Sequence, residues 1–210
     1  VSKSIKSGWI SSEGPSVKEF EHKIAKFLNR KFGCAVSSGT AALEIAIRSL
    51  GLNKNDEVVI SKFSFIIYRI YSKLNFAKII YAAENNFTSS VDNILSSVTK
   101  KTKIVFIANP NNPTGTYINK KELLRLRKKL RSDILLVVDD AYFEYLSYKD
   151  YENGLKLFSK FKNVVVTRTF SKIYGLAGLR VGWAYSSKDI INALYKIKPP
   201  FNVSRPALFA

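Results

Sequence analysis

The chain has 210 residues, which suits one large domain, and 46% of them are hydrophobic, enough to bury a core. That composition excludes a disordered tail, and no apolar run reaches the length of a membrane span. The formal net charge is +18, but the lysines are spread along the chain instead of forming one block. We interpret them as solvated surface residues. A basic nucleic-acid-binding module is the alternative from another functional class.

Cys34 is the only cysteine of the sequence, and His22 is the only histidine. Disulfides within the chain are therefore excluded, and a reducing cytoplasm is the expected location. Histidine-rich metal sites are excluded as well. So are catalytic schemes that pair serine or cysteine with histidine, unless His22 serves them. His22 lies in an amphipathic pattern, where we expect an exposed side chain.

Helical and strand patterns alternate along the chain. The first helix is predicted within residues 16–32, with Ser16 as its N-cap. Short apolar strands and further helices then follow one another. The strands are predicted at 34–38, 58–61, 78–82, 103–108, 134–139 and 164–168, and the helices at 40–50, 65–73, 119–130 and 187–198, the last ending before Pro199 and Pro200. This alternation predicts a three-layer α/β/α fold with a mostly parallel sheet and a ligand site at the carboxyl ends of its strands.

Polar residues follow several of the predicted strands. Ser38-Gly39-Thr40 stands between a strand and a helix, where backbone N–H groups form an anion site. The turn NPNNPTG (109–115) carries Asn112, and Asp139 ends an apolar strand where an acid needs a cationic partner. Later strand ends carry a phenol, a lysine and an arginine, namely Tyr142, Lys172 and Arg180. Each alone is compatible with ordinary capping, turns or surface positions. Together they match the phosphate, ring nitrogen, phenolic oxygen and aldehyde of pyridoxal 5'-phosphate.

Lys172 stands in the largely apolar run RTFSKIYGLAGLRVGW, residues 168–183. Burying a lysine costs free energy unless its charge is neutralised. A Schiff base with the cofactor aldehyde would remove that charge. We therefore expect Lys172 in an apolar setting, and the alternative is a surface lysine whose stem lies along apolar neighbours.

Three motifs, NPNNPTG, VVDDAYFEY and TFSKIYGLAGLRVGW, resemble those of the fold-type I pyridoxal-phosphate enzymes, specifically the class I and II aminotransferases. From about residue 58 on, the chain resembles the histidinol-phosphate aminotransferases. SGWISSEGPSVKEFEHKIAKFL and AVSSGTAAL resemble the nucleotide-sugar aminotransferases, a neighbouring branch of the fold. The resemblance implies a transaminase that acts on histidinol phosphate and 2-oxoglutarate in histidine biosynthesis. Nucleotide-sugar transamination and a related decarboxylation stay open.

The resemblance also implies roles for the residues that match the family motifs. Lys172 would bind the cofactor covalently and move a proton at the substrate's α-carbon. Asp139 would pair with the pyridinium nitrogen, and Phe65 would stack on the ring. Tyr142 and Asn112 would bind the phenolic oxygen. The phosphate would be held by Gly39, Thr40, Thr169, Ser171 and Arg180.

The resemblance divides the chain into an N-terminal segment and helix (1–30), the cofactor-binding large domain (31–198) and the start of an inter-domain segment (199–210). The smaller C-terminal domain of the family carries an arginine that binds the substrate carboxylate. We expect this domain to be absent, and Arg205 does not match that arginine. The expected partners are a small-molecule amino donor, a carbonyl acceptor and a second copy of the full-length protein, with neither nucleic acid nor membrane. A catalytically incomplete fragment is the remaining alternative.

Overall fold

The structure is a computed structural model of the chain, and it describes residues 6, 15–27, 32–199, 202–204 and 206–207. The expectations for Pro200 and Arg205, and for parts of the terminal segments 1–30 and 199–210, lie outside these residues. Within the described ranges, no helix is both long and apolar enough to cross a membrane.

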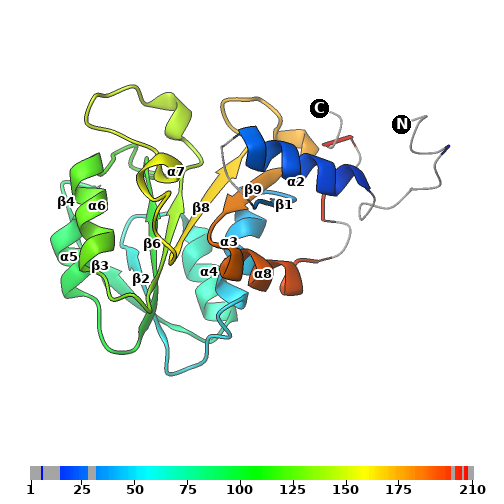
Figure 1. The fold of residues 1–210 in the computed structure, drawn as a ribbon. Coiled ribbons are helices and arrows are strands. Elements are labelled where there is room, and N and C mark those ends of the chain that lie inside the picture. The colour runs from blue at the N-terminus through cyan, green and yellow to red at the C-terminus, as the bar shows by residue number, and fades with distance from the viewer. Residues whose placement is uncertain (1–5, 7–14, 28–31, 200–201, 205, 208–210) are drawn as a thin grey trace.

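A seven-stranded sheet forms the centre of the described structure (Figure 1). Its strands are β1 (Cys34–Val36), β2 (Glu57–Ser61), β3 (Lys78–Ala82), β6 (Thr102–Ala108), β7 (Leu135–Asp139), β8 (Val164–Thr169) and β9 (Gly182–Tyr185). The strand order is β1-β9-β8-β7-β6-β2-β3, and the five strands from β8 to β3 are parallel. Strand β9 runs antiparallel to both of its neighbours. The prediction of a mostly parallel sheet is therefore confirmed.

Helices cover both faces of the sheet, so the predicted three-layer arrangement is also confirmed (Figure 1). On one face, which we call the cavity face, lie α3 (Gly39–Arg48), α4 (Ile66–Leu74) and α8 (Lys188–Ile197). On the other, the back face, lie α5 (Val91–Ser96), α6 (Lys120–Lys129) and the short α7 (Gly154–Leu157). Helix α2 (Pro15–Phe27) packs beside β1, where Val17 contacts a small third cluster that includes Ala35. Each face has its own apolar core.

Several predicted boundaries require correction. Ser16 is not an N-cap, because α2 already begins at Pro15 and Ser16 lies in its first turn, a position where proline's fixed φ favours the helix. Phe32 was expected to be helical and is not. Ser38 was expected to end a strand, but it caps α3 instead, since its Oγ accepts a hydrogen bond of 3.0 Å from the Ala41 N–H. His22 is exposed on α2, as predicted.

Several short elements of the structure are not apparent from the sequence pattern. They are β9, α5, α7 and the hairpin of β4 (Glu84–Asn85) and β5 (Thr88–Ser89). None of them is longer than six residues, too short for a periodicity of hydrophobic residues to be recognised. Strand β9, which was not predicted, matters for the position of α3. It lies between β8 and β1 in the sheet, and β1 leads directly into α3.

The carboxyl ends of β6, β7 and β8 lie side by side, since Ala108 pairs with Asp139 and Asp139 with Thr167. The N-terminus of helix α3 lies at the same edge, because it packs against Gly182 of β9. A Cβ on Gly182 would lie 2.7 Å from the Gly39 nitrogen and 2.8 Å from the Arg168 oxygen. Only glycine permits such a close approach of two backbones. The fold thereby places the α3 N-terminus beside the ends of three parallel strands.

Candidate active site

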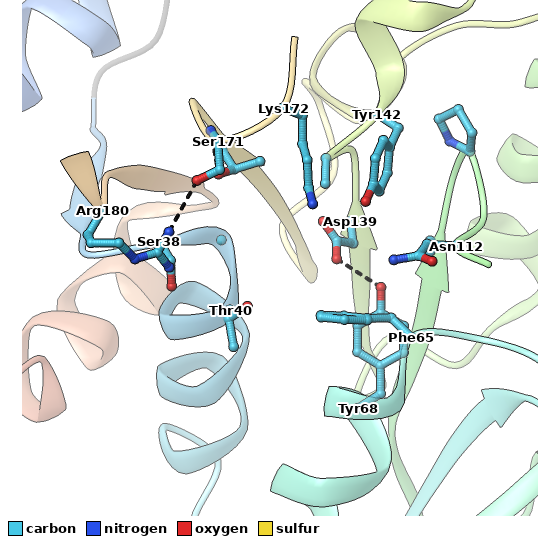
Figure 2. A pocket seen from close by; sticks show the side chains of 15 residues that line it. Ser38, Thr40, Phe65, Tyr68, Asn112, Asp139, Tyr142, Ser171, Lys172 and Arg180 are labelled. Atoms are coloured by element: carbon cyan, nitrogen blue, oxygen red, sulfur yellow. Dashed lines mark hydrogen bonds between the residues drawn. The ribbon is translucent and has the colours of Figure 1, made fainter. Parts of the chain in front are cut away.

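One cavity at this sheet edge is lined by all of the residues that the sequence predicted as cofactor-binding (Figure 2). They are Gly39, Thr40, Phe65, Asn112, Asp139, Tyr142, Thr169, Ser171, Lys172 and Arg180. The cavity walls also include residues outside the predicted cofactor-binding set, namely Ser38, Tyr68, Ala108, Pro110 and Ala141. Residues far apart in the sequence thus converge on a single concave site, the usual form of a small-molecule site.

Asp139 provides a buried carboxylate to the cavity from the end of β7 and is only 7% exposed. Two hydroxyls donate to it: Tyr68 Oη at 2.9 Å and Thr167 Oγ1 at 3.1 Å. Burial raises the pKa of Asp139. The two hydroxyls, the Ala141 N–H and the charge of Lys172 act in the opposite direction. These donors are what a buried carboxylate needs in order to hold a negative charge.

Tyr68 is the main residue of the cavity that the sequence analysis missed. It is fully buried, stacks on Phe106 with ring centroids 4.8 Å apart and donates to Asp139. Burial, together with the neighbouring Asp139, raises the pKa of this phenol well above its usual value, so Tyr68 remains a donor. One signal was available. Tyr68 follows Phe65 by three residues in a predicted helix, which places both on one helix face.

Lys172 and Tyr142 lie on the wall opposite α4, and both side chains point toward Asp139 (Figure 2). Lys172 Nζ lies 5.0 Å from the centroid of the Tyr142 ring. Tyr142 precedes the short 3₁₀ helix η1 (Phe143–Tyr145) and accepts at its backbone oxygen a 3.1 Å hydrogen bond from the Tyr145 N–H. An amine, a phenol and a carboxylate therefore face the same space.

The expected apolar setting of Lys172 is wrong. Lys172 is exposed, and so are its neighbours Ile173 (45%) and Tyr174 (50%). The residues after β8 turn back on themselves in a tight surface loop, in which the Gly175 N–H donates to the Lys172 oxygen at 2.9 Å. The Lys172 side chain can therefore reach the cavity while staying in contact with water, and no covalent modification is needed to explain its position.

Asn112 and Phe65 complete the wall near Tyr142 and Tyr68 (Figure 2). Asn112 lies in the loop after β6. Hydrogen bonds of two nearby asparagines fix this loop. Asn111 Nδ2 donates to the Phe63 oxygen at 2.8 Å, and Asn109 exchanges two hydrogen bonds with the backbone of Ile118. The Phe65 ring stands edge-on to Tyr68 at 5.8 Å. It offers an apolar surface next to the buried carboxylate.

The opposite end of the cavity is suited to an anion. Gly39 and Thr40 begin α3. Ser38 accepts hydrogen bonds from the next two N–H groups, those of Ala41 and Ala42. The N–H groups of Gly39 and Thr40 have no acceptor among the residues that the structure describes. Unpaired N–H groups at a helix N-terminus favour negative charge. A cationic side chain stands nearby: Arg180 Nη1 lies 3.5 Å from Ser171 Oγ.

Arg180 adopts the left-handed conformation, with φ of 54° and ψ of 63°, which is uncommon for a residue other than glycine. It directly follows the 3₁₀ helix η2 (Ala177–Leu179) and donates to the Ala177 oxygen at 2.9 Å. Thr169 fixes the start of the same loop, since its Oγ1 accepts a 3.1 Å hydrogen bond from the Ser171 N–H. Such backbone conformations are concentrated at functional sites.

The described part of the chain contains no group of three histidine, cysteine, aspartate or glutamate side chains that could hold a metal ion. The charged and polar groups of the cavity instead form a carboxylate end, an anion-binding end and an amine between them.

Comparison with known proteins identifies the family. The family model described as "Aminotransferase class I and II" matches residues 9–210. The chain belongs to this family. A histidinol-phosphate aminotransferase of Pelagibacter ubique is 52% identical over 192 residues, which covers 89% of this chain and 53% of that protein. A histidinol-phosphate aminotransferase of Paramagnetospirillum magneticum is 51% identical over 155 residues, which covers 74% of this chain and 43% of that protein.

Solved structures of aminotransferases share the fold. The histidinol-phosphate aminotransferase of Sinorhizobium meliloti, solved with pyridoxal-5'-phosphate, has a TM-score of 0.88 at 23% identity, over 98% of this chain and 56% of its own. A Thermus thermophilus aspartate aminotransferase has a TM-score of 0.81 at 19% identity, over 95% of this chain and 59% of its own. The fold is therefore that of the large domain of such enzymes. The chain spans about half the length of the curated relatives that it matches.

Proposed function

We propose that the chain forms the cofactor-binding part of a pyridoxal-phosphate-dependent aminotransferase, and that the whole protein exchanges an amino group between histidinol phosphate and 2-oxoglutarate in histidine biosynthesis. The observation that carries this proposal is the convergence of Lys172, Asp139 and the α3 N-terminus on one cavity. The substrate class rests on relatives that are about half identical to this chain and are named histidinol-phosphate aminotransferases.

The residues of the cavity fit the cofactor at each of its functional groups. The unpaired N–H groups of Gly39 and Thr40, with Arg180 and Ser171 nearby, suit a phosphate. Asp139 suits a protonated ring nitrogen, since it is a buried carboxylate whose own charge is stabilised by two hydroxyls. Lys172 Nζ projects into the space between these two ends, where an aldehyde would be reached (Figure 2).

When bound, pyridoxal phosphate supplies an electron sink for the negative charge that develops at the substrate's α-carbon. Asp139 would keep a proton on the ring nitrogen. Lys172 Nζ would take the proton from the substrate's α-carbon and deliver it to the carbon of the cofactor's aldehyde group. Tyr142 and Asn112 would orient the ring by hydrogen bonds at its phenolic oxygen, and Phe65 would stack on the ring and exclude water.

The division of the chain follows from the same proposal. Residues 31–198 would be the cofactor-binding large domain, preceded by an N-terminal segment and helix (1–30) and followed by the start of an inter-domain segment (199–210). All strands of the main sheet lie between Cys34 and Tyr185, and α8 ends at Ile197, which supports these limits. We also propose a cytoplasmic location, supported by a single cysteine that is buried as a free thiol.

A homodimer of the whole protein is part of the proposal. Large apolar side chains are exposed next to the cavity, among them Phe63 (43%), Ile66 (52%) and Phe87 (63%). Phe63 and Pro113 line two neighbouring depressions, and one of them shares Phe65 with the cavity. Apolar groups gathered in this way are typical of surfaces that another protein surface covers.

The proposal is tested by incubating the chain with pyridoxal phosphate, reducing it with borohydride and locating the phosphopyridoxyl group by mass spectrometry. We expect the group on Lys172 and its loss in Lys172→Ala. The matched control Lys188→Ala, which removes another lysine amine, should keep the label. Labels scattered over surface lysines, or none at all, would contradict the proposal.

The substrate is tested on the whole protein by measuring which compounds convert the pyridoxal form of the cofactor into the pyridoxamine form and back. We expect histidinol phosphate as amino donor and 2-oxoglutarate as acceptor. Reoxidation only by a keto sugar nucleotide would replace this substrate class and leave the cofactor site intact.

A further inference from the structure

Arg168 is a buried charged residue that the proposed reaction does not use. It lies in β8, is 7% exposed and does not line the cavity. Its neighbours Thr167 and Thr169 point to the cavity face, so its own side chain points to the back face. There the guanidinium lies 3.4 Å from the centroid of the Phe143 ring and 5.5 Å from that of Trp183.

Arg168 forms an ion pair with Glu144 that is almost removed from water. Nη2 of Arg168 lies 2.7 Å from Glu144 Oε1, and the side chains are 8% and 12% exposed. Burial lowers the pKa of Arg168, while the charges of Asp140 and Glu144 act against this effect. Replacing a buried ion pair by apolar side chains of similar volume is often neutral or stabilising. A contribution to stability therefore does not by itself explain why Arg168 and Glu144 are paired here.

The pair connects the two segments that carry Tyr142 and Lys172. Glu144 and Phe143 belong to η1, which directly follows Tyr142 and is hydrogen-bonded to its backbone oxygen. Arg168 belongs to the strand that leads into the Lys172 loop. In that loop, burial and the charge of Glu144 raise the pKa of the Tyr174 phenol, while Arg168 lowers it, so Tyr174 lies within the electrostatic reach of both side chains. The segments that carry Tyr142 and Lys172 therefore meet at one ion pair.

We propose that Arg168 and Glu144 are positioning residues, which hold the Tyr142 phenol in place relative to Lys172 Nζ. This inference rests on the proposed function, since Tyr142 is taken to orient the cofactor ring. Neither residue touches the cavity, so both act through Tyr142. Loss of the pair frees η1 from β8, and the phenol is then no longer held within hydrogen-bond reach of the ring.

The test uses the 210-residue chain loaded with pyridoxal phosphate and compares Glu144→Gln with Glu122→Gln. The control removes the same charge from an ion pair with Arg125 on α6, on the back face and away from the cavity. We measure cofactor affinity and the pH midpoint at which the absorbance of the bound cofactor changes. Glu144→Gln should weaken binding about tenfold, within the usual range of coupling between contacting residues. Glu122→Gln should leave both quantities unchanged.

A double-variant cycle separates positioning from mere stabilisation. Tyr142→Phe should shift the midpoint in the same direction as Glu144→Gln, and the two changes together should shift it no further. Tyr174→Phe changes a half-exposed neighbour of the same ion pair, so it should disturb folding less. It provides a second test if Glu144→Gln does not fold. We expect it to weaken binding about threefold.

The outcomes distinguish this inference from the function on which it rests. Absence of the label from Lys172 in the unsubstituted chain would overturn both. A labelled chain in which Glu144→Gln behaves like Glu122→Gln would overturn the positioning role alone. Shifts that add fully in the Glu144→Gln, Tyr142→Phe double variant would overturn it as well.

Discussion

Two neighbouring aspartates at the end of β7 serve the two faces of the sheet. Asp139 points to the cavity face, where two hydroxyls donate to it. Asp140 points to the back face and is fully buried. There its Oδ2 accepts from the Gly154 N–H at 2.7 Å, while Oδ1 has no partner among the described residues. Burial raises the pKa of Asp140 to about 8, and that of Asp139 is raised as well but opposed by more hydrogen bonds.

The contrast shows that two buried carboxyls can differ in how strongly their surroundings favour the charged form. Asp139 is the last residue of β7 and Asp140 follows it directly, and both are removed from water. The cavity face surrounds its carboxylate with donors that favour the charged form, whereas the back face supplies one N–H and the charge of Arg168. The neighbours of Asp139 thus favour its charged form before any ligand binds, which is what the proposed role requires.

The largest effect is expected from Gly182→Ala, which tests how tightly the cavity face is built. Its methyl group would meet the backbone of Gly39 and Arg168 at less than 3 Å, so α3 would have to move away. We expect a loss of about 3 kcal/mol of unfolding free energy, measured by urea denaturation, and the loss of cofactor labelling at Lys172. Gly178→Ala, whose methyl group would meet no atom within 4 Å, is the matched control. Equal stability of the two variants would show that the close approach is not needed.

Tyr68→Phe tests whether the donors around Asp139 matter. The variant keeps the ring stack on Phe106 but removes one of the two hydroxyls that donate to the buried carboxylate. We expect a loss of about 2 kcal/mol in unfolding free energy near pH 7 and a higher pKa of Asp139. Tyr117→Phe removes a hydroxyl that donates to the exposed Asp150 and should cost far less. A similar cost for both would remove the distinction between the two settings.

Asp140→Asn tests the back-face carboxyl by its pH dependence. Folding raises the pKa of Asp140 from 3.8 to about 8, so the folded chain binds this proton more tightly than the unfolded chain. Its contribution to stability is therefore present at low pH and is lost as pH rises from about 4 to about 8.

We expect Asp140→Asn to reduce the decline in unfolding free energy between pH 5 and pH 8 by about 1–2 kcal/mol. Denaturant titrations at several pH values measure this decline. Asp133→Asn is the control, because hydrogen bonding to Arg131 lowers the pKa of Asp133 and removes it from this window. An unchanged decline in Asp140→Asn would mean that Asp140 ionises normally.

The smallest effect is expected from Gly154→Ala, the back-face counterpart of Gly182→Ala. Its methyl group would lie 3.2 Å from Asp140 Oδ2 and from side-chain carbons of Val138 and Val166. These are side chains that can shift by a few tenths of an ångström, so about 1 kcal/mol should be lost, with cofactor labelling unchanged. Thermal denaturation and mass spectrometry measure the two quantities. A loss as large as that of Gly182→Ala would show that the back face is equally rigid.

Much of the cavity lining could be predicted from the sequence, because its residues stand in motifs directly after apolar strands. Asp139 and Lys172 both line the cavity, since the ends of parallel strands meet at one edge. Tyr68 was missed because its role depends on a partner 71 positions away. The pairing of Arg168 with Glu144 was equally hidden, since it depends on the register between β7 and β8 and on the turn of η1.

The exposure of Lys172 was predicted wrongly for a related reason. An apolar sequence around a residue indicates burial only when the segment enters a core. Residues 171–180 instead form a surface loop whose apolar side chains Ile173 and Tyr174 stay in contact with water. Hydrophobic composition alone does not distinguish these two cases.

The pairing of β1 with β9 has a consequence for the order in which the site is built. Cys34 lies opposite Ala184, so strands separated by 184 − 34 = 150 residues are neighbours. During synthesis, β1 and the start of α3 leave the ribosome early and must wait for β9 before they can join the sheet. The carboxylate end of the cavity comes from β7 and α4, which need no such partner. The anion-binding end is therefore the last part of the cavity to form.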